Sequence, residues 1–87
     1  MDKKLKVIKA LADTTRLKII ILLLAKEHCV CQLQRTLCMS QPRVSRHLSI
    51  LKMAGLINSR REGKMIFFFI INSKKNQKIL EFVKKNK

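Results

Sequence analysis

Three cysteines lie within ten residues of one another, and two of them, Cys29 and Cys31, are separated by a single residue. Thiolates are soft ligands that suit thiophilic metal and metalloid ions and do not suit Mg²⁺ or Ca²⁺. The cysteines are odd in number and too close together for disulfides between them to stabilise the fold. This cysteine usage favours a reducing compartment. The spacing predicts a soft-ion site at Cys29 and Cys31. The alternative is that all three cysteines are small buried hydrophobic residues.

Basic and polar side chains gather at the start of a predicted helix that begins after Ser40 and ends near Gly55. Arg and Gln form bidentate hydrogen bonds with guanine and adenine edges, whereas Ser and the backbone amides of a helix N-terminus suit phosphates. Helical spacing is expected to place the arginines and His47 on the outward face, opposite the apolar residues. The candidate DNA contacts in this helix are Ser40, Gln41, Arg43, Ser45, Arg46 and His47. The alternative is a solvated basic face.

A second basic group surrounds the tip of a predicted β-hairpin. Residues 56–61 and 64–71 flank a Glu-Gly turn, and the second segment alternates its large apolar side chains as a strand does. Arg60, Arg61 and Lys64 suit contacts with phosphates or the minor groove, which position a protein on DNA without reading much sequence. Basic residues also keep exposed sheet edges soluble, and this is the alternative.

The composition favours a folded and strongly cationic domain. The chain has 87 residues, a formal net charge of +15 and an apolar share of 47%, which predicts one small domain spanning residues 1–87. Such a charge favours a polyanionic partner such as nucleic acid and disfavours an enzyme. The longest apolar run, Ile19 to Ala25, is far shorter than the roughly 20 residues of a spanning helix and does not resemble a signal peptide. We therefore expect a cytoplasmic protein that binds no membrane.

Hydrophobic periodicity predicts five helices around these candidate sites. They cover residues 2–12, 16–26, 31–37, 40–55 and 73–87. Asp13 is expected to cap the second helix, whose run of isoleucines and leucines should make it the central buried element, with a buried strand as the alternative. A tight turn joins the third and fourth helices. The expected fold is mainly α with a small β-hairpin, a winged helix-turn-helix of order α-α-α-α-β-β-α, whose second motif helix reads the DNA major groove.

Several segments resemble the ArsR/SmtB family of bacterial and archaeal metal-sensing repressors. They are Leu11-Ala12-Asp13-Thr14-Thr15-Arg16-Leu17, Ser40-Gln41-Pro42-Arg43-Val44-Ser45-Arg46-His47-Leu48, Ala54-Gly55-Leu56-Ile57 and Glu62-Gly63-Lys64. The resemblance implies a homodimeric repressor that binds an inverted-repeat operator in double-stranded DNA and releases it when an inducer binds. It assigns the serine-to-leucine segment to DNA contact and the basic hairpin to the wing.

The segment Glu27-His28-Cys29-Val30-Cys31-Gln32-Leu33 resembles the arsenic-sensing box of that family, often written E-L-C-V-C-D-L. This resemblance implies that Cys29 and Cys31 are the inducer ligands. Gln32 replaces the usual Asp, and Gln34 stands where many arsenic sensors have a third cysteine. The pair is expected to bind a trivalent metalloid with a non-protein third ligand, to recruit another cysteine, or to act as a redox switch.

Helix geometry limits how the cysteines can cooperate. Residues two apart in a helix diverge by about 200°, so Cys29 and Cys31 can share an ion only if the helix unwinds or begins after Cys29. We expect binding to strain this helix and move the attached recognition helix out of register with the groove. Cys38 lies about 10 Å farther along an intact helix and is expected to have a core or turn role. His28 is either a further ligand or simply solvated.

The first and last predicted helices each carry an apolar stripe, and the family pairs these helices between subunits. The stripes are Leu5, Ile8 and Leu11 in the first helix and Ile79, Leu80 and Val83 in the last. The resemblance therefore implies a homodimer formed by these two helices. Glu81 is the only acidic residue of the last helix, so the zinc site that some family members carry there is not expected.

Together with these features, the resemblance implies a metal- or metalloid-responsive transcriptional repressor. Arsenite or antimonite is the expected inducer, with another thiophilic metal as an alternative, and no resident cofactor is expected. A thiol redox-responsive repressor of the same fold and a basic nucleic-acid-binding protein without sensing are the other possibilities. An enzyme is not expected, because no carboxylate and His are arranged with a cysteine as a catalytic set.

Overall fold

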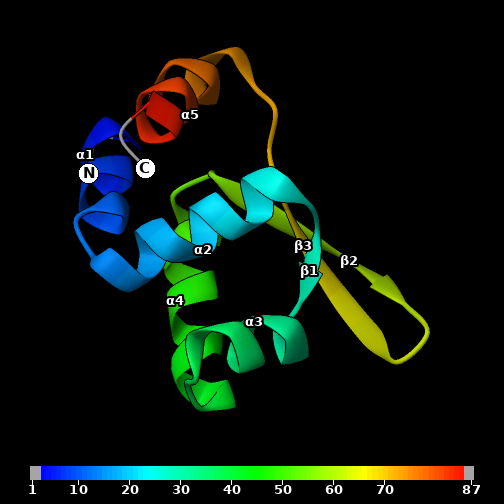
Figure 1. Cartoon of the computed structure of the whole chain (residues 1–87). Coiled ribbons are helices and arrows are strands. Elements are labelled where there is room, and N and C mark those ends of the chain that lie inside the picture. Colours follow the sequence, from blue (N-terminus) through cyan, green and yellow to red (C-terminus); the bar gives the residue numbers. More distant parts are fainter. Residues whose placement is uncertain (1–2, 86–87) are drawn as a thin grey trace.

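The computed structural model describes residues 3–85. The elements follow one another as α1 (Lys3–Leu11), α2 (Thr14–Ala25), β1 (His28–Cys29), α3 (Val30–Leu37), α4 (Gln41–Met53), β2 (Ile57–Glu62), β3 (Met65–Ile70) and α5 (Lys74–Lys85). Figure 1 shows α1 and α5 at one side of the molecule and the β2–β3 hairpin at the other. The expected winged helix-turn-helix is confirmed, with one additional strand. Within the described residues no helix is long and apolar enough to cross a membrane.

Helix α2 runs through the middle of the fold, as its apolar sequence predicts. Its residues Ile19, Ile20 and Leu23 are buried, together with Leu48 and others from α4 and the neighbouring elements. Because α2 is apolar on most of its circumference, it can contact helices and sheet at once. The segment is a helix and not the buried strand that its isoleucines allowed.

Caps fix where the central helices begin and end. The Asp13 carboxylate accepts a hydrogen bond from the Arg16 backbone N–H at 3.0 Å, and α2 begins at Thr14, two residues earlier than predicted. This backbone hydrogen bond holds the pKa of the Asp13 carboxyl below its ordinary value. Ser40 precedes α4 without a side-chain capping bond. Gly55 follows α4 with φ +80°, the left-handed conformation predicted there.

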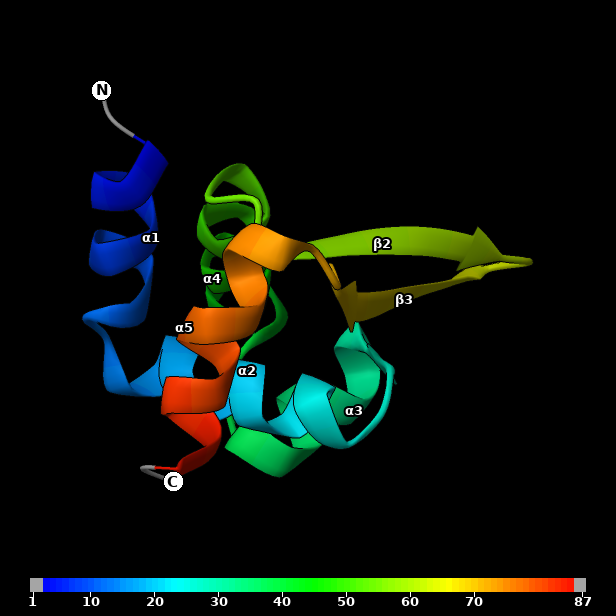
Figure 2. The ribbon, with the colours of Figure 1, turned by 90° about the horizontal axis from the view of Figure 1, so that it is seen from above.

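The hairpin is part of a three-stranded antiparallel sheet of order β1-β3-β2. Its turn lies at Gly63-Lys64, one residue later than predicted, with Gly63 at φ +61°. Figure 2 shows the hairpin extending well beyond the helices. Strand β1 was not predicted, because two residues are too few to show alternation. Its pairing places His28 opposite Phe68 and Cys29 opposite Phe67, so the cysteine box is attached to the wing.

Asn76 in the first turn of α5 is buried and joins three parts of the chain. Its Nδ2 donates to the Gly55 carbonyl at 2.9 Å and to the Ile71 carbonyl at 3.1 Å. These hydrogen bonds hold α5 against the end of α4 and the end of the sheet. They explain why a short polar side chain occupies a buried position in an otherwise amphipathic helix.

We expect Asn76→Ala to lower the free energy of unfolding by about 1–3 kcal/mol, because both carbonyls lose the Asn76 donor and only the Ile71 carbonyl keeps another, the Ser73 N–H. Urea unfolding followed by circular dichroism measures the change. Asn72→Ala is the control, since Asn72 is exposed just before the same helix. Equal losses in the two variants would contradict the assignment.

Candidate DNA-binding helix and cysteine site

Helices α3 and α4 are joined by a tight turn in which Cys38 adopts the left-handed conformation with φ 54°. Helix α4 buries Val44, Leu48 and Leu51. The opposite side of its N-terminal half is exposed at Ser40, Gln41, Arg43 and Arg46, while Ser45 is half-buried. Gln41 donates to the Ser45 hydroxyl at 2.8 Å, so part of this surface is already ordered. The arrangement presents hydrogen-bond donors and positive charge from one helix end.

His47 does not lie on that outward face, and the expectation that it does was wrong. It is three residues after Val44 and four before Leu51, which places it beside the buried stripe. Arg16 donates to its Nδ1 at 3.3 Å, and the Asp13 carboxylate is 3.8 Å from the same atom. Arg16 also donates to two backbone carbonyls at the end of α1. His47 therefore ties α4 to the junction of α1 and α2.

The three basic residues expected at the hairpin tip separate into two groups. Arg61 and Lys64 are exposed beside the turn, and Arg61 donates to the Gly63 carbonyl at 3.1 Å. Arg60 instead forms ion pairs with Glu27 and, at 3.1 Å, with Glu62. These two carboxylates, Glu27 first, raise the pKa of the Arg60 guanidinium. Only Arg61 and Lys64 of the three remain directed at solvent without a carboxylate partner among the described residues.

The two cysteines of the box lie side by side. Helix α3 begins at Val30, so Cys29 is its N-cap and not part of the helix. The sulfur atoms of Cys29 and Cys31 are 3.4 Å apart. Two sulfurs at this separation, each about 2.3 Å from a common ion, subtend an angle of about 95°. The pair therefore suits one soft ion without the helix deformation that sequence spacing led us to expect.

Gln32 organises this site through a capping box. Its side-chain oxygen accepts from the Cys29 backbone N–H at 2.9 Å, and its own backbone N–H faces the Cys29 sulfur. Burial raises the pKa of the Cys29 thiol, but the hydrogen bonds with the Gln32 backbone and with Cys31 outweigh it and leave the pKa below its ordinary value. The comparison with the family's box shows Gln32 only as a departure from Asp. The capping-box spacing was the signal that could have identified its role.

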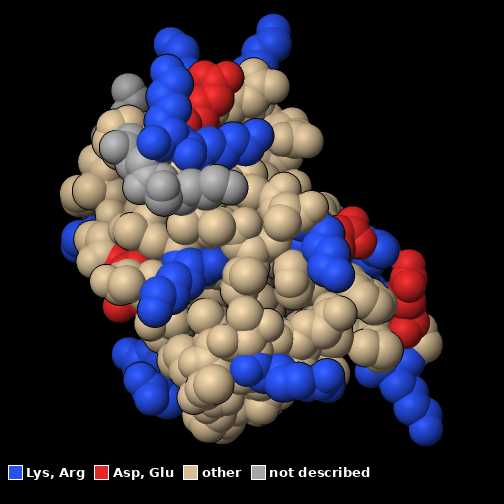
Figure 3. Space-filling view, in the orientation of Figure 1, with Lys and Arg blue, Asp and Glu red and all other residues tan. Residues whose placement is uncertain are grey.

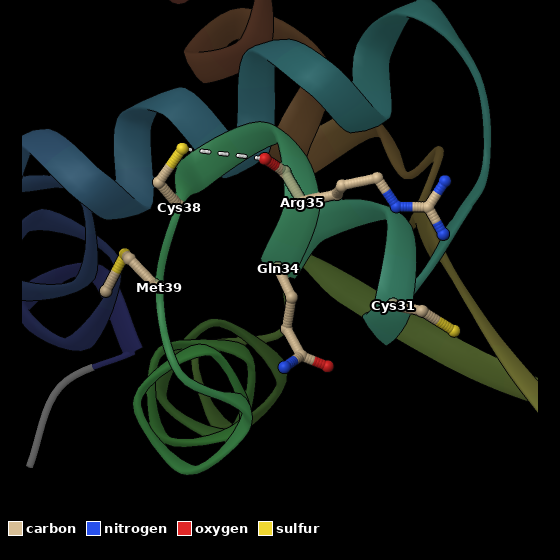
Figure 4. Close-up of a pocket in the computed structure, with 5 residues that line it drawn as sticks. All are labelled: Cys31, Gln34, Arg35, Cys38 and Met39. Atoms are coloured by element: carbon tan, nitrogen blue, oxygen red, sulfur yellow. Dashed lines mark hydrogen bonds between the residues drawn. The ribbon is translucent and has the colours of Figure 1, made fainter.

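Among the described residues two thiols lie together, and no third His, Cys, Asp or Glu side chain joins them in a cluster. Figure 4 shows Cys31 and Cys38 at opposite ends of a shallow hollow, with the Cys38 sulfur turned toward the Arg35 carbonyl, 3.7 Å away. His28 is buried, not solvated, and its Nδ1 lies 2.8 Å from the Lys26 carbonyl. Residues 3–85 contain no cluster of three His, Cys, Asp or Glu side chains that could hold a metal ion.

Positive charge dominates the chain, whose formal net charge is +15. Figure 3 shows Lys and Arg side chains over the helices and the hairpin, with few acidic side chains between them. The exposed donors of α4 therefore lie in a generally positive field, which raises the local concentration of a polyanion.

The sequence matches the family model described as bacterial regulatory protein, arsR family, over residues 13–59. The chain belongs to the ArsR family. A helix-turn-helix transcriptional regulator of Methanocaldococcus jannaschii is 39% identical over 74 residues, which cover 84% of this chain and 83% of that regulator. The resemblance deduced from the signature segments is thereby confirmed.

A second relative, the arsenical resistance operon repressor of Escherichia coli, is 48% identical over 61 residues. The match covers 69% of this chain but 52% of that repressor, so the chain spans about half the length of this relative. A solved structure, the homodimeric winged helix-turn-helix domain of a possible ArsR-family regulator from Mycobacterium bovis, superposes with a TM-score of 0.85 at 31% identity. The superposition covers 95% of this chain and 76% of that one. These relatives are named as transcriptional regulators and not as enzymes.

Proposed function

We propose that this chain is a transcriptional repressor whose operator binding is relieved by a thiophilic ion, arsenite or antimonite first, bound between Cys29 and Cys31. The observation that carries the proposal is the 3.4 Å separation of two free thiols at the start of the helix-turn-helix. A relative named as an arsenical resistance operon repressor supports the choice of ion. A reducing cytoplasm, where we place the protein, keeps both thiols available.

The proposed DNA surface consists of the exposed start of α4 and the hairpin tip. Gln41 and Arg43 are assigned to base edges in the major groove, and Arg46 and the serines to phosphates or neighbouring edges. Arg61 and Lys64 are assigned to the DNA backbone. His47 and Arg60 are assigned to positioning these elements, because the His47 Nδ1 and the Arg60 guanidinium already have partners within the chain.

Release is proposed to follow from the double role of Cys29. Its sulfur caps α3 and is also one of the two ion ligands. When arsenite or antimonite binds, a bond forms from the Cys29 sulfur to the metalloid, a metalloid–oxygen bond breaks, and the thiol proton leaves with that hydroxide as water. The sulfur lone pair that faces the first turn of α3 is thereby engaged, so the cap changes when the inducer binds. Because α3 packs directly on α4, a small reorientation of α3 alters the presentation of α4 to the groove.

The experiment that tests this function uses the full chain and an operator selected from a random duplex library. Fluorescence anisotropy then measures operator binding against arsenite, antimonite, cadmium, lead, zinc and peroxide. We expect an inverted-repeat operator and release by arsenite and antimonite. Binding that ignores sequence, or a selected operator that no soft ion releases, would contradict the proposal.

The two parts of the DNA surface are expected to respond differently to substitution. Replacing Gln41 or Arg43 with Ala should cost roughly 1–3 kcal/mol of operator binding and relax base preference. Replacing Arg61 or Lys64 should weaken binding to all DNA sequences alike. It should also reduce the slope of log affinity against log salt concentration by about one unit. Titrations of operator and scrambled duplexes at several salt concentrations measure both effects. A change of base preference in the hairpin variants alone would reverse the assignment.

A further inference from the structure

Three residues form a row across the sheet between the cysteine pair and the wing. Phe67 of β3 is paired with Cys29 of β1 on one side and with Arg60 of β2 on the other. Directly opposed residues in antiparallel strands project from the same face of a sheet. The sensing thiol, an aromatic ring and a wing arginine therefore stand next to one another.

Arg60 is held in this row from three directions. Its guanidinium lies 5.5 Å from the centre of the Phe67 ring, a cation–π geometry. It forms an ion pair with Glu62 of its own strand and another with Glu27. Glu27 lies two residues before Cys29, outside the strand pairing. The Glu27–Arg60 ion pair is thus a side-chain connection from the cysteine box to the wing.

This connection matters because the backbone connection is short. Strand β1 has two residues, whereas β2 and β3 pair over six positions and form a stiff hairpin. The two-residue pairing of β1 with β3 fixes where the hairpin lies relative to the cysteine box, but it hardly fixes the angle between them. Helices α2 and α3 also pack on β3, but the Glu27–Arg60 ion pair attaches the segment just before Cys29 directly to β2. This second attachment favours rotation of the hairpin when Cys29 moves.

We propose that Glu27 and Arg60 are positioning residues that transmit inducer binding from the Cys29–Cys31 pair to the wing. The inference rests on the proposed function and adds a second route beside the one through α3 and α4. Movement of Cys29 displaces Phe67 and Arg60 together, and the projecting hairpin amplifies this displacement at its tip, where Arg61 and Lys64 lie (Figure 2). Release then combines loss of groove fit at α4 with loss of backbone contacts at the wing.

The test compares Glu27→Gln with Glu62→Gln. Both remove one carboxylate from Arg60, but only Glu27 connects it to the cysteine box. Arsenite affinity is measured without DNA from the sulfur–arsenic absorbance, and operator affinity is measured with and without saturating arsenite. The ratio of the two operator affinities is the coupling factor, about 5- to 150-fold in typical allosteric proteins.

We expect Glu27→Gln to reduce the coupling factor about fivefold or to abolish it, with arsenite affinity unchanged, and Glu62→Gln to keep it. Arg60→Gln and the Glu27→Gln, Arg60→Gln double variant should lose no more coupling than Glu27→Gln alone, as a shared contact requires. In NMR spectra without DNA, arsenite should shift the amide signals of residues 57–70 in the unmodified chain and much less in Glu27→Gln.

Each other result has a defined meaning. If arsenite neither binds the unmodified chain nor releases the operator from it, the proposed function fails. If arsenite releases the operator equally from the unmodified chain and from Glu27→Gln, the proposed function stands and transmission through Glu27 is overturned. Equal loss of coupling in Glu27→Gln and Glu62→Gln also overturns it, because the effect then follows from charge near the wing and not from the connection to the box.

Discussion

Replacing either Cys29 or Cys31 with Ser is expected to abolish release of the operator by arsenite and to leave operator binding itself intact. A single thiolate cannot chelate the ion, and a serine oxygen is too hard to replace the missing sulfur. Serine is also a preferred N-cap, so α3 should keep its start when Cys29 is replaced. In typical allosteric proteins the effector changes the affinity by about 5- to 150-fold. In these variants arsenite should not change the operator affinity. Operator titrations with and without arsenite measure this directly.

Cys38→Ser is the matched control for these variants. The Cys38 sulfur faces the Arg35 carbonyl at the far end of α3, so its loss should preserve most of the response. Release by arsenite that persists in the Cys29→Ser, Cys31→Ser double variant would show that this pair is not the sensing site. Release that depends on Cys38 alone would assign the site to Cys38 instead. Reversal by excess thiol without a disulfide on a non-reducing gel would distinguish ligation from oxidation.

Much of the fold could be predicted because the long helices and strands are determined by local sequence patterns. The apolar run of α2, the Asp13 cap and the glycine after α4 each follow from the preferences of a few neighbouring residues. Strand β1 could not be predicted in this way. Its two residues are defined only by pairing with β3, a contact between segments about forty residues apart in the chain.

The residue types of the candidate site are visible in the sequence, but the surroundings of each side chain are not. Helical spacing separated the exposed Arg43 and Arg46 from the buried stripe, yet His47 lies at the edge of that stripe and is held by Arg16. Arg60 has the same side chain as Arg61, but the Glu27 carboxylate that holds it comes from a distant loop. Whether a basic side chain is available to DNA therefore depends on tertiary contacts that a linear pattern does not contain.

The same limitation applies to the apolar stripes assigned to the dimer. In α5, Leu80 and Val83 are buried in the core of the chain itself, while Phe82 is 68% exposed. In α1, Leu5 is 41% and Ile8 is 64% exposed. A stripe that faces the core and one that faces a second subunit have the same helical period. We therefore assign the proposed interface to the exposed apolar side chains of α1 and α5, which are Leu5, Ile8 and Phe82. These two helices lie at the side of the molecule opposite the hairpin (Figure 1).

Ile8→Glu is expected to convert the proposed homodimer into monomers and to weaken operator binding by about 10²–10⁴-fold, the usual gain from linking two binding modules. A carboxylate on each subunit would be desolvated within the proposed interface without a positive partner to compensate it. Two half-sites about one helical turn apart require a two-fold protein for simultaneous binding. Sedimentation equilibrium measures the mass, and operator titration measures the affinity.

Lys6→Glu on the same helix is the control, because Lys6 is exposed and two residues away, which turns it by about 200° from Ile8. It changes the net charge by more than Ile8→Glu does, so a loss of DNA affinity caused by charge alone would be at least as large in this variant. If Ile8→Glu is monomeric and still binds the inverted repeat as tightly as the unmodified chain, the operator is bound without a dimer. If Ile8→Glu remains dimeric and Lys6→Glu does not, α1 pairs through its other face.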